Sequence, residues 1–211
     1  MSGAVLALSA GSSTALWYLS RGTGLVAFVL LSATVVLGLV ASVGWTTERW
    51  PRFLSQTLHR NLSLFCIVLV AIHVVTIVAD PFVQTGIVAA VLPTGTSYRP
   101  LWVGLGSLAF DMLLALAVSS GLRRAIGLRA WRGVHWLAYA CWPIALLHAF
   151  GAGTDTMLPV VLTLYGACSA VVLAAALWRL ANGSARAASG DPVGTIHGTV
   201  PDPRAGRRVD R

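Results

Sequence analysis

The sequence contains no lysine and few charged residues of any kind, which limits the class of protein it can encode. Charged residues make up 10% of its 211 positions, whereas hydrophobic residues make up 56% and the mean hydropathy is +0.77. A water-soluble domain of this size needs far more surface charge, so the composition excludes one and predicts an integral membrane protein. Arginine in place of lysine, with abundant alanine, valine and glycine, is typical of a GC-rich and, we infer, bacterial genome.

Cysteine is also scarce, and its three copies form no recognisable motif. Cys66, Cys141 and Cys168 all lie inside apolar runs. The sequence has neither the C-x-x-C of a redox or zinc pair nor the C-x-x-C-H of covalent haem attachment. We interpret all three as small core residues.

Five apolar runs are long enough to cross a bilayer, which takes about 20 residues. They cover residues 22–43, 54–78, 101–122, 130–150 and 157–180. Within lipid each run must be helical, because every backbone polar group needs an internal partner. The predicted fold is therefore an all-α bundle of five transmembrane helices, or six if the first 20 residues form another span.

The rest of the chain divides around this bundle. Residues 1–21 are predicted to form an outer N-terminal segment, and residues 22–180 the bundle itself. Residues 181–211, rich in glycine, proline, serine, alanine and arginine, are expected to be a disordered basic tail in the cytoplasm. The apolar centre of residues 80–100 is too short to span and is predicted to cover the outer end of the bundle.

The arginines predict how the chain crosses the membrane. Thirteen of the fifteen lie in the loops after the first and third spans, at the starts of the spans that follow, and in the tail, while Arg21 and Arg99 lie on the other side. Positive charge accumulates on the cytoplasmic side, so the N-terminus is predicted outside and the C-terminus inside a plasma membrane. The arginines form no continuous face, so we expect contact with membrane lipid rather than nucleic acid.

Four of the five histidines lie in two of the predicted spans. His59 and His73 are fourteen residues apart in the second, which places them within about 40° of one helix face and about 21 Å apart along its axis. His135 and His148 are thirteen residues apart in the fourth. Apart from this shared pattern we find no internal repeat, and His197 in the tail is assigned no role.

Because both spans run from inside to outside, His59 and His135 share the inner depth and His73 and His148 the outer depth. Each pair could clamp a planar macrocycle through both axial positions of its iron, for which imidazole is a common ligand. Thirteen residues of ideal helix leave His148 about 140° from the face of His135. We expect a distortion between Ala140 and Pro143 to correct this difference.

With the stretches "LHRNLSL…AIHVV" and "GVHWLAYACWPIALLHAFGAGTD", the chain resembles the ferric reductase-like transmembrane family over about residues 16–180. That family includes the membrane domains of ferric reductases and NADPH oxidases. The resemblance implies two b-type haems, held by His59 with His135 and by His73 with His148, and electron transfer from inside to outside. Family members commonly have six spans, whereas five are counted here.

Many relatives continue into a cytoplasmic flavin and nicotinamide domain. This sequence has no G-x-G-x-x-G after a strand and ends about 30 residues after its last span, too few for such a domain. We therefore expect no flavin or NAD(P) site in this chain. The expected electron donor is a separate protein or a membrane quinol, and the acceptor lies at the outer face.

Several charged residues are candidates to support these cofactors. Arg60 and Arg132, with Arg129, lie at the inner level, and Arg99 lies at the outer one beside Tyr98; each could pair with haem propionates or simply anchor a helix at the interface. Asp111, in the middle of the third span, could bond a histidine's second ring nitrogen, carry protons, or be protonated and bonded to another helix. Asp80, Thr154 and Asp155 are candidates for an outer acceptor site.

The predicted function is that of a transmembrane electron-transfer subunit, a component of a ferric reductase-like oxidoreductase. No residues suggest a nucleophile or a general acid–base pair. Three alternatives stay open. The first is a quinol-linked cytochrome b subunit, the second a haem-free transporter whose histidines bind a metal ion or relay protons, and the third a haem-free scaffold subunit.

Overall fold

Helices form the whole framework of the part of the chain that the computed structural model describes, residues 2–44, 50–80, 86–93 and 98–188. In order they are α1 (Ser2–Val43), α2 (Arg52–Ala79), α3 (Ile87–Val91), α4 (Pro100–Gly121), α5 (Arg123–His135), α6 (Leu137–Ala152) and α7 (Pro159–Ala188). The predicted all-α membrane fold is confirmed. Among the residues described, four helices contain stretches long and apolar enough to span a bilayer: Thr14–Val43, Phe53–Ala79, Pro100–Gly121 and Pro159–Asn182.

The fourth predicted span is divided. Its apolar part is α6, which has 16 residues and is shorter than the other four. Helix α6 follows α5 at Trp136, where the backbone stays helical (φ −63°, ψ −22°), whereas Gly127 inside α5 departs from helical geometry (φ 79°, ψ 163°) and kinks that helix. At Trp136 the helix tightens locally, because the Tyr139 N–H donates to the carbonyl of Trp136, three residues back instead of four (3.1 Å). Helix α6 is continuous through Pro143, and this three-residue hydrogen bond directly precedes the stretch from Ala140 to Pro143 where a distortion was expected.

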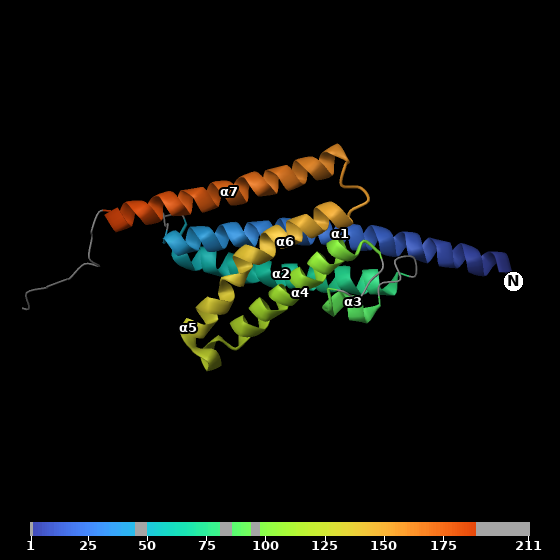
Figure 1. Ribbon diagram of the computed structural model, residues 1–211, viewed down its shortest axis with the longest axis horizontal. Coiled ribbons are helices and arrows are strands. Elements are labelled where there is room, and N and C mark those ends of the chain that lie inside the picture. Colours follow the sequence, from blue (N-terminus) through green and yellow to red (C-terminus); the bar gives the residue numbers. More distant parts are fainter. Residues whose placement is uncertain (1, 45–49, 81–85, 94–97, 189–211) are drawn as a thin grey trace, which may run out of the picture.

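Two ends of the bundle differ from the predicted boundaries. Helix α1 begins at Ser2, so the predicted outer segment continues into the first span as one helix, which Figure 1 shows extending past its neighbours. Helix α7 continues to Ala188, beyond the predicted start of the tail at residue 181. The remainder of the predicted tail, residues 189–211, lies outside the described residues.

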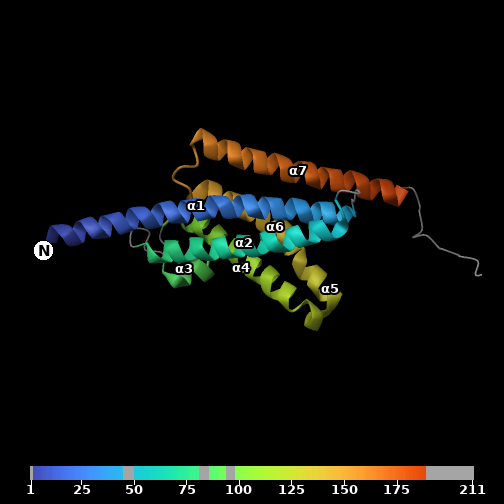
Figure 2. The same ribbon diagram turned by 180° about the vertical axis from the view of Figure 1, so that it is seen from behind.

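The bundle consists of two tightly packed helix pairs and one flanking helix. Helices α1 and α2 pack along their length, α4 packs on α6, and α7 lies along α1 (Figures 1 and 2). A core cluster joins α1, α6 and α7; in it Phe28 contacts Trp142 and Tyr165, and the Trp142 indole N–H donates to the Ser32 hydroxyl (2.9 Å). Within the described residues α2 and α6 scarcely touch, so a space remains between these two helices.

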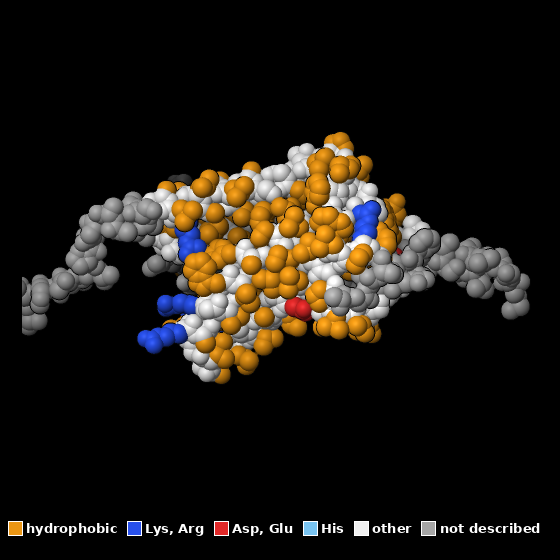
Figure 3. All heavy atoms as spheres, viewed as in Figure 1, with side chains coloured by type: hydrophobic (Ala, Val, Ile, Leu, Met, Phe, Trp, Pro, Cys, Tyr) orange, Lys and Arg blue, Asp and Glu red, His pale blue; other side chains and the backbone are white. Residues whose placement is uncertain are grey.

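The outer surface of the bundle is largely hydrophobic. Leu64, Phe65 and Val75 of α2 and Leu173 and Leu177 of α7 each expose more than half of their area. Figure 3 shows hydrophobic side chains spread over the visible face, with arginines gathered towards its two ends. An exposed apolar surface of this extent is suited to contact with lipid.

Candidate functional site

The four histidines of the spans meet as two facing pairs across the space between α2 and α5–α6. The ring centroids of His59 and His135 are 6.2 Å apart, and those of His73 and His148 are 6.3 Å apart. Two imidazoles on opposite sides of one metal ion, each with a metal–nitrogen bond of about 2 Å, would have centroids about 6 Å apart. Both gaps therefore have the width that a shared metal ion requires.

Three of the four imidazoles are anchored through Nδ1 to a backbone carbonyl of the neighbouring helix. The bonds join His59 to Thr34 (3.0 Å), His73 to Ser20 (2.7 Å) and His148 to Trp102 (2.8 Å). A carbonyl oxygen can only accept, so the proton of each neutral ring lies on Nδ1. Nε2 is then the nitrogen whose lone pair is available to a metal.

The fourth imidazole, His135, is held in another way. Its Nδ1 is buried and has no hydrogen-bond partner among the described residues, and its ring stacks on Trp131 at a centroid distance of 4.8 Å. Trp131 has two further contacts. The Arg123 guanidinium carbon lies 4.5 Å from the centroid of the Trp131 ring, and the indole N–H donates a long hydrogen bond to the Ser120 hydroxyl (3.4 Å). The pair His59–His135, which we call the inner pair after its predicted depth, therefore combines one ring anchored to a carbonyl and one ring held by stacking; His73–His148 is correspondingly called the outer pair.

A cavity surrounds the outer pair. Its space, counted together with the open solvent at its mouth, is about 1100 Å³ and lies between α1, α2, α3, α4 and α6, with Tyr165 of α7 also in the lining. Most of its lining is apolar, and the polar side chains in it include Arg21, Ser107 and Tyr165 besides His73 and His148. Helix α3, from the segment predicted to cover the outer end, contributes Ala89 and Ala90 to the wall.

Two buried thiols extend the same arrangement towards mid-depth. In the α1–α2 pair, Cys66 comes seven residues from His73, and its thiol contacts the carbonyl of Ala27, seven residues from Ser20. In the α4–α6 pair, Cys141 comes seven residues from His148, and its thiol contacts the carbonyl of Ala109, seven residues from Trp102. The pairs α1–α2 and α4–α6 thus repeat the same contacts. The sequence showed no internal repeat because the two pairs share spacing and backbone contacts rather than residue types.

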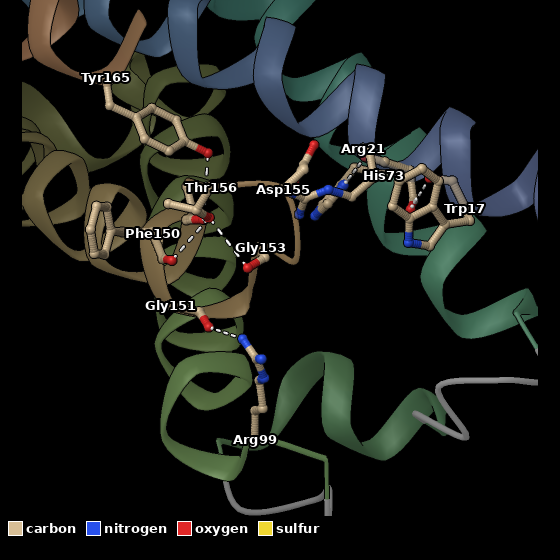
Figure 4. A network of polar contacts seen from close by, with 12 residues as sticks. Trp17, Arg21, His73, Arg99, Phe150, Gly151, Gly153, Asp155, Thr156 and Tyr165 are labelled. Atoms are coloured by element: carbon tan, nitrogen blue, oxygen red, sulfur yellow. Dashed lines mark hydrogen bonds and ion pairs between the residues drawn. The ribbon is translucent and has the colours of Figure 1, made fainter. Parts of the chain in front are cut away.

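The cation at the outer pair is Arg21, which sequence reasoning assigned only to topology. Arg21 lines the cavity and forms an ion pair with Asp155 of the α6–α7 loop; the two side chains lie beside His73 in Figure 4. Arg99 instead donates to the Gly151 carbonyl (2.7 Å) at an exposed position and does not line the cavity. The sequence did contain a signal for this pair, because Arg21 and Asp155 carry opposite charges and both lie just before the start of a predicted span on the same side.

The remaining candidates lie around the site rather than in it. Arg60, next to His59, and Arg132, three residues before His135, are both exposed at the inner end. Asp111 is partly buried on α4 and is not the partner of any anchored imidazole, because those partners are carbonyls. Asp80 is buried, with 6% of its area exposed. No cluster of three or more metal-binding side chains occurs in the described part of the chain.

Comparison with known proteins gives one family. The profile described as "Ferric reductase like transmembrane component" matches residues 23–146, more than half of the chain, and includes His59, His73 and His135. No curated protein and no solved structure matches significantly. The match agrees with the apolar helices and the paired histidines. We conclude that the chain belongs to the ferric reductase-like transmembrane family and is a multi-pass membrane redox component.

Proposed function

We propose that this chain is a transmembrane electron-transfer subunit with two b-type haems. His59 and His135 hold the inner haem, and His73 and His148 hold the outer one. Electrons enter from a cytoplasmic donor protein or a membrane quinol and leave to an acceptor at the outer face. In this proposal residues 22–180 form the haem-binding bundle, the N-terminus lies outside, and the basic tail from residue 181 lies in the cytoplasm.

The observation that carries the proposal is the geometry of the facing imidazoles. Each site offers two ring nitrogens, which is the number of axial ligands that a low-spin haem takes from a protein. The carbonyl bonds of His59, His73 and His148 fix the tautomer in which Nε2 is free. The centroid distances of 6.2 and 6.3 Å leave room for one iron between the rings of each pair.

The vertical spacing supports transfer across the membrane. His59 and His73 are fourteen residues apart on α2, or about 21 Å along the helix, in a hydrocarbon core about 30 Å thick. A bound haem supplies the one-electron chemistry. The chain holds the sites at two depths and surrounds the outer one with mostly apolar walls.

Charges at both ends fit the anionic propionates of haem. Arg21 borders the outer cavity, where it is already oriented by Asp155, and Arg99 lies outside the lining, bonded to the Gly151 carbonyl. Arg60 and Arg132 are exposed at the inner level beside His59 and His135. Guanidinium groups bind carboxylates through two parallel hydrogen bonds. We propose Arg21 for the outer haem ahead of Arg99, and Arg60 and Arg132 for the inner one.

An optical spectrum of the detergent-purified protein, oxidised and dithionite-reduced, with a pyridine haemochrome assay, tests the proposal. We expect a low-spin b-type spectrum and about two haems per chain. A colourless protein after expression with adequate haem would refute it and favour the metal or proton transporter. Reduction of the haems in membranes by added quinol would identify the quinol-linked alternative, and its absence would favour a donor protein.

A further inference from the structure

Three glycines lie directly against the anchored imidazoles. A Cβ built on Gly106 would be 2.5 Å from the His148 ring, one on Gly24 would be 2.9 Å from the His73 ring, and one on Gly38 would be 3.4 Å from the His59 ring. The first two distances are shorter than Cβ atoms tolerate, and the third is tight. Any other residue at 24 or 106 would displace the imidazole or the helix.

Each glycine comes four residues after the carbonyl that accepts the Nδ1–H bond. The three sets are Ser20 with Gly24, Thr34 with Gly38, and Trp102 with Gly106. We call each set a glycine notch. In an α-helix the side chain of a residue lies over the preceding turn, which contains the carbonyl four residues earlier. A glycine leaves that carbonyl uncovered, so the oxygen can accept a second hydrogen bond besides its helical one.

We propose that Gly24, Gly38 and Gly106 are positioning residues that set the tautomer and orientation of three haem-ligating histidines. The inference rests on the proposed function, because it assigns the purpose of the notches to haem ligation. His135 has no notch: Ser120 contacts Trp131, and Trp131 stacks on the imidazole. The outer haem is thus held between two notched ligands and the inner haem by one notched and one stacked ligand.

Alanine substitutions test the proposal, with haem content and the low-spin ferric EPR signals as readouts. Gly106→Ala should lower the haem content from about two per chain to about one, with loss of the outer signal. Gly24→Ala should shift or weaken the same signal. Gly38→Ala, where the distance is 3.4 Å, should shift the inner signal only slightly. The order of effects follows the three distances.

The matched control is Gly22→Ala. Gly22 lies two residues from Gly24 on α1, and a Cβ there would have nothing within 4 Å. It should leave haem content and both EPR signals unchanged. If Gly106→Ala and Gly24→Ala behave like Gly22→Ala in a parent protein that binds two haems, the notch proposal is overturned while the haem proposal stands. A parent protein without haem overturns both.

A double variant separates positioning from helix packing. In His148→Ala the imidazole is gone, so adding Gly106→Ala should cause no further loss of haem or of monodisperse protein. If the double variant loses the inner haem as well, or fails to yield folded protein where His148→Ala succeeds, Gly106 is needed for helix packing. That result would overturn its assignment as a positioning residue.

Discussion

Replacing the histidines two at a time shows which two belong to one site. Every single variant, such as His148→Ala, should lower the haem content from about two per chain to about one. The double variants should differ from one another. His73→Ala with His148→Ala removes both ligands of one site and should keep about one haem, whereas His59→Ala with His148→Ala damages both sites and should keep none.

The structure gives the magnitudes behind this expectation. His135 and His148 are thirteen residues apart, so the sites are separated by about 20 Å. Substitutions more than about 7–10 Å apart usually have independent effects, so the remaining site should bind normally. Removing the His148 ring also removes its bond to the Trp102 carbonyl, which costs about 0.5–1.5 kcal/mol, because that carbonyl keeps its helical partner.

The assay is a pyridine haemochrome count on monodisperse detergent-purified protein, normalised to chain concentration. His197→Ala is the control, because the fifth histidine lies in the tail and should leave the count at its parent value. The pairing is wrong if the His73→Ala, His148→Ala variant loses all haem while the His59→Ala, His148→Ala variant keeps one.

Three further predictions concern stability and topology. Asp155→Asn leaves Arg21 without its ionic partner and should lower the free energy of unfolding by about 1 kcal/mol, measured by thermal unfolding in detergent. Trp142→Phe removes the buried bond to Ser32 and should cost about 1 kcal/mol in the same assay; an unchanged midpoint contradicts it. Thr154→Cys, made in a chain in which Cys168 has been replaced, should react with a membrane-impermeant maleimide added outside the cell. Labelling only after lysis would contradict the predicted orientation.

The spans and the histidine pairs were predictable because both depend on regular helix geometry. Runs of apolar residues require helices in lipid, and the rise per residue sets the depths of His59 and His73. The facing of His73 with His148 follows once two helices run in the same direction. Two of the glycine notches could also have been predicted. Gly24 and Gly38 are fourteen residues apart, as are His59 and His73, so two antiparallel helices bring Gly24 opposite His73 and Gly38 opposite His59.

Other features depend on local contacts that hydropathy does not report. The kink at Gly127 and the altered hydrogen bond at Trp136 each involve a single residue, which an averaged apolar run cannot locate. Helix α6 continues through Pro143, as membrane helices tolerate proline. Arg21 and Arg99 count equally in a topology argument. Only the structure shows that Arg99, with its left-handed backbone (φ 42°), turns its side chain to Gly151, while Arg21 faces the cavity.

Every carbonyl anchor lies within one helix pair. His59 and His73 bond to α1, and His148 bonds to α4, so none of the three bonds crosses between the α1–α2 and α4–α6 pairs. Because α1 and α2 are made first, two imidazoles can be oriented in the membrane before α6 has been synthesised. The second pair then packs on the first through Phe28, Ser32 and Trp142, and each proposed haem would add a link between a histidine of one half and a histidine of the other.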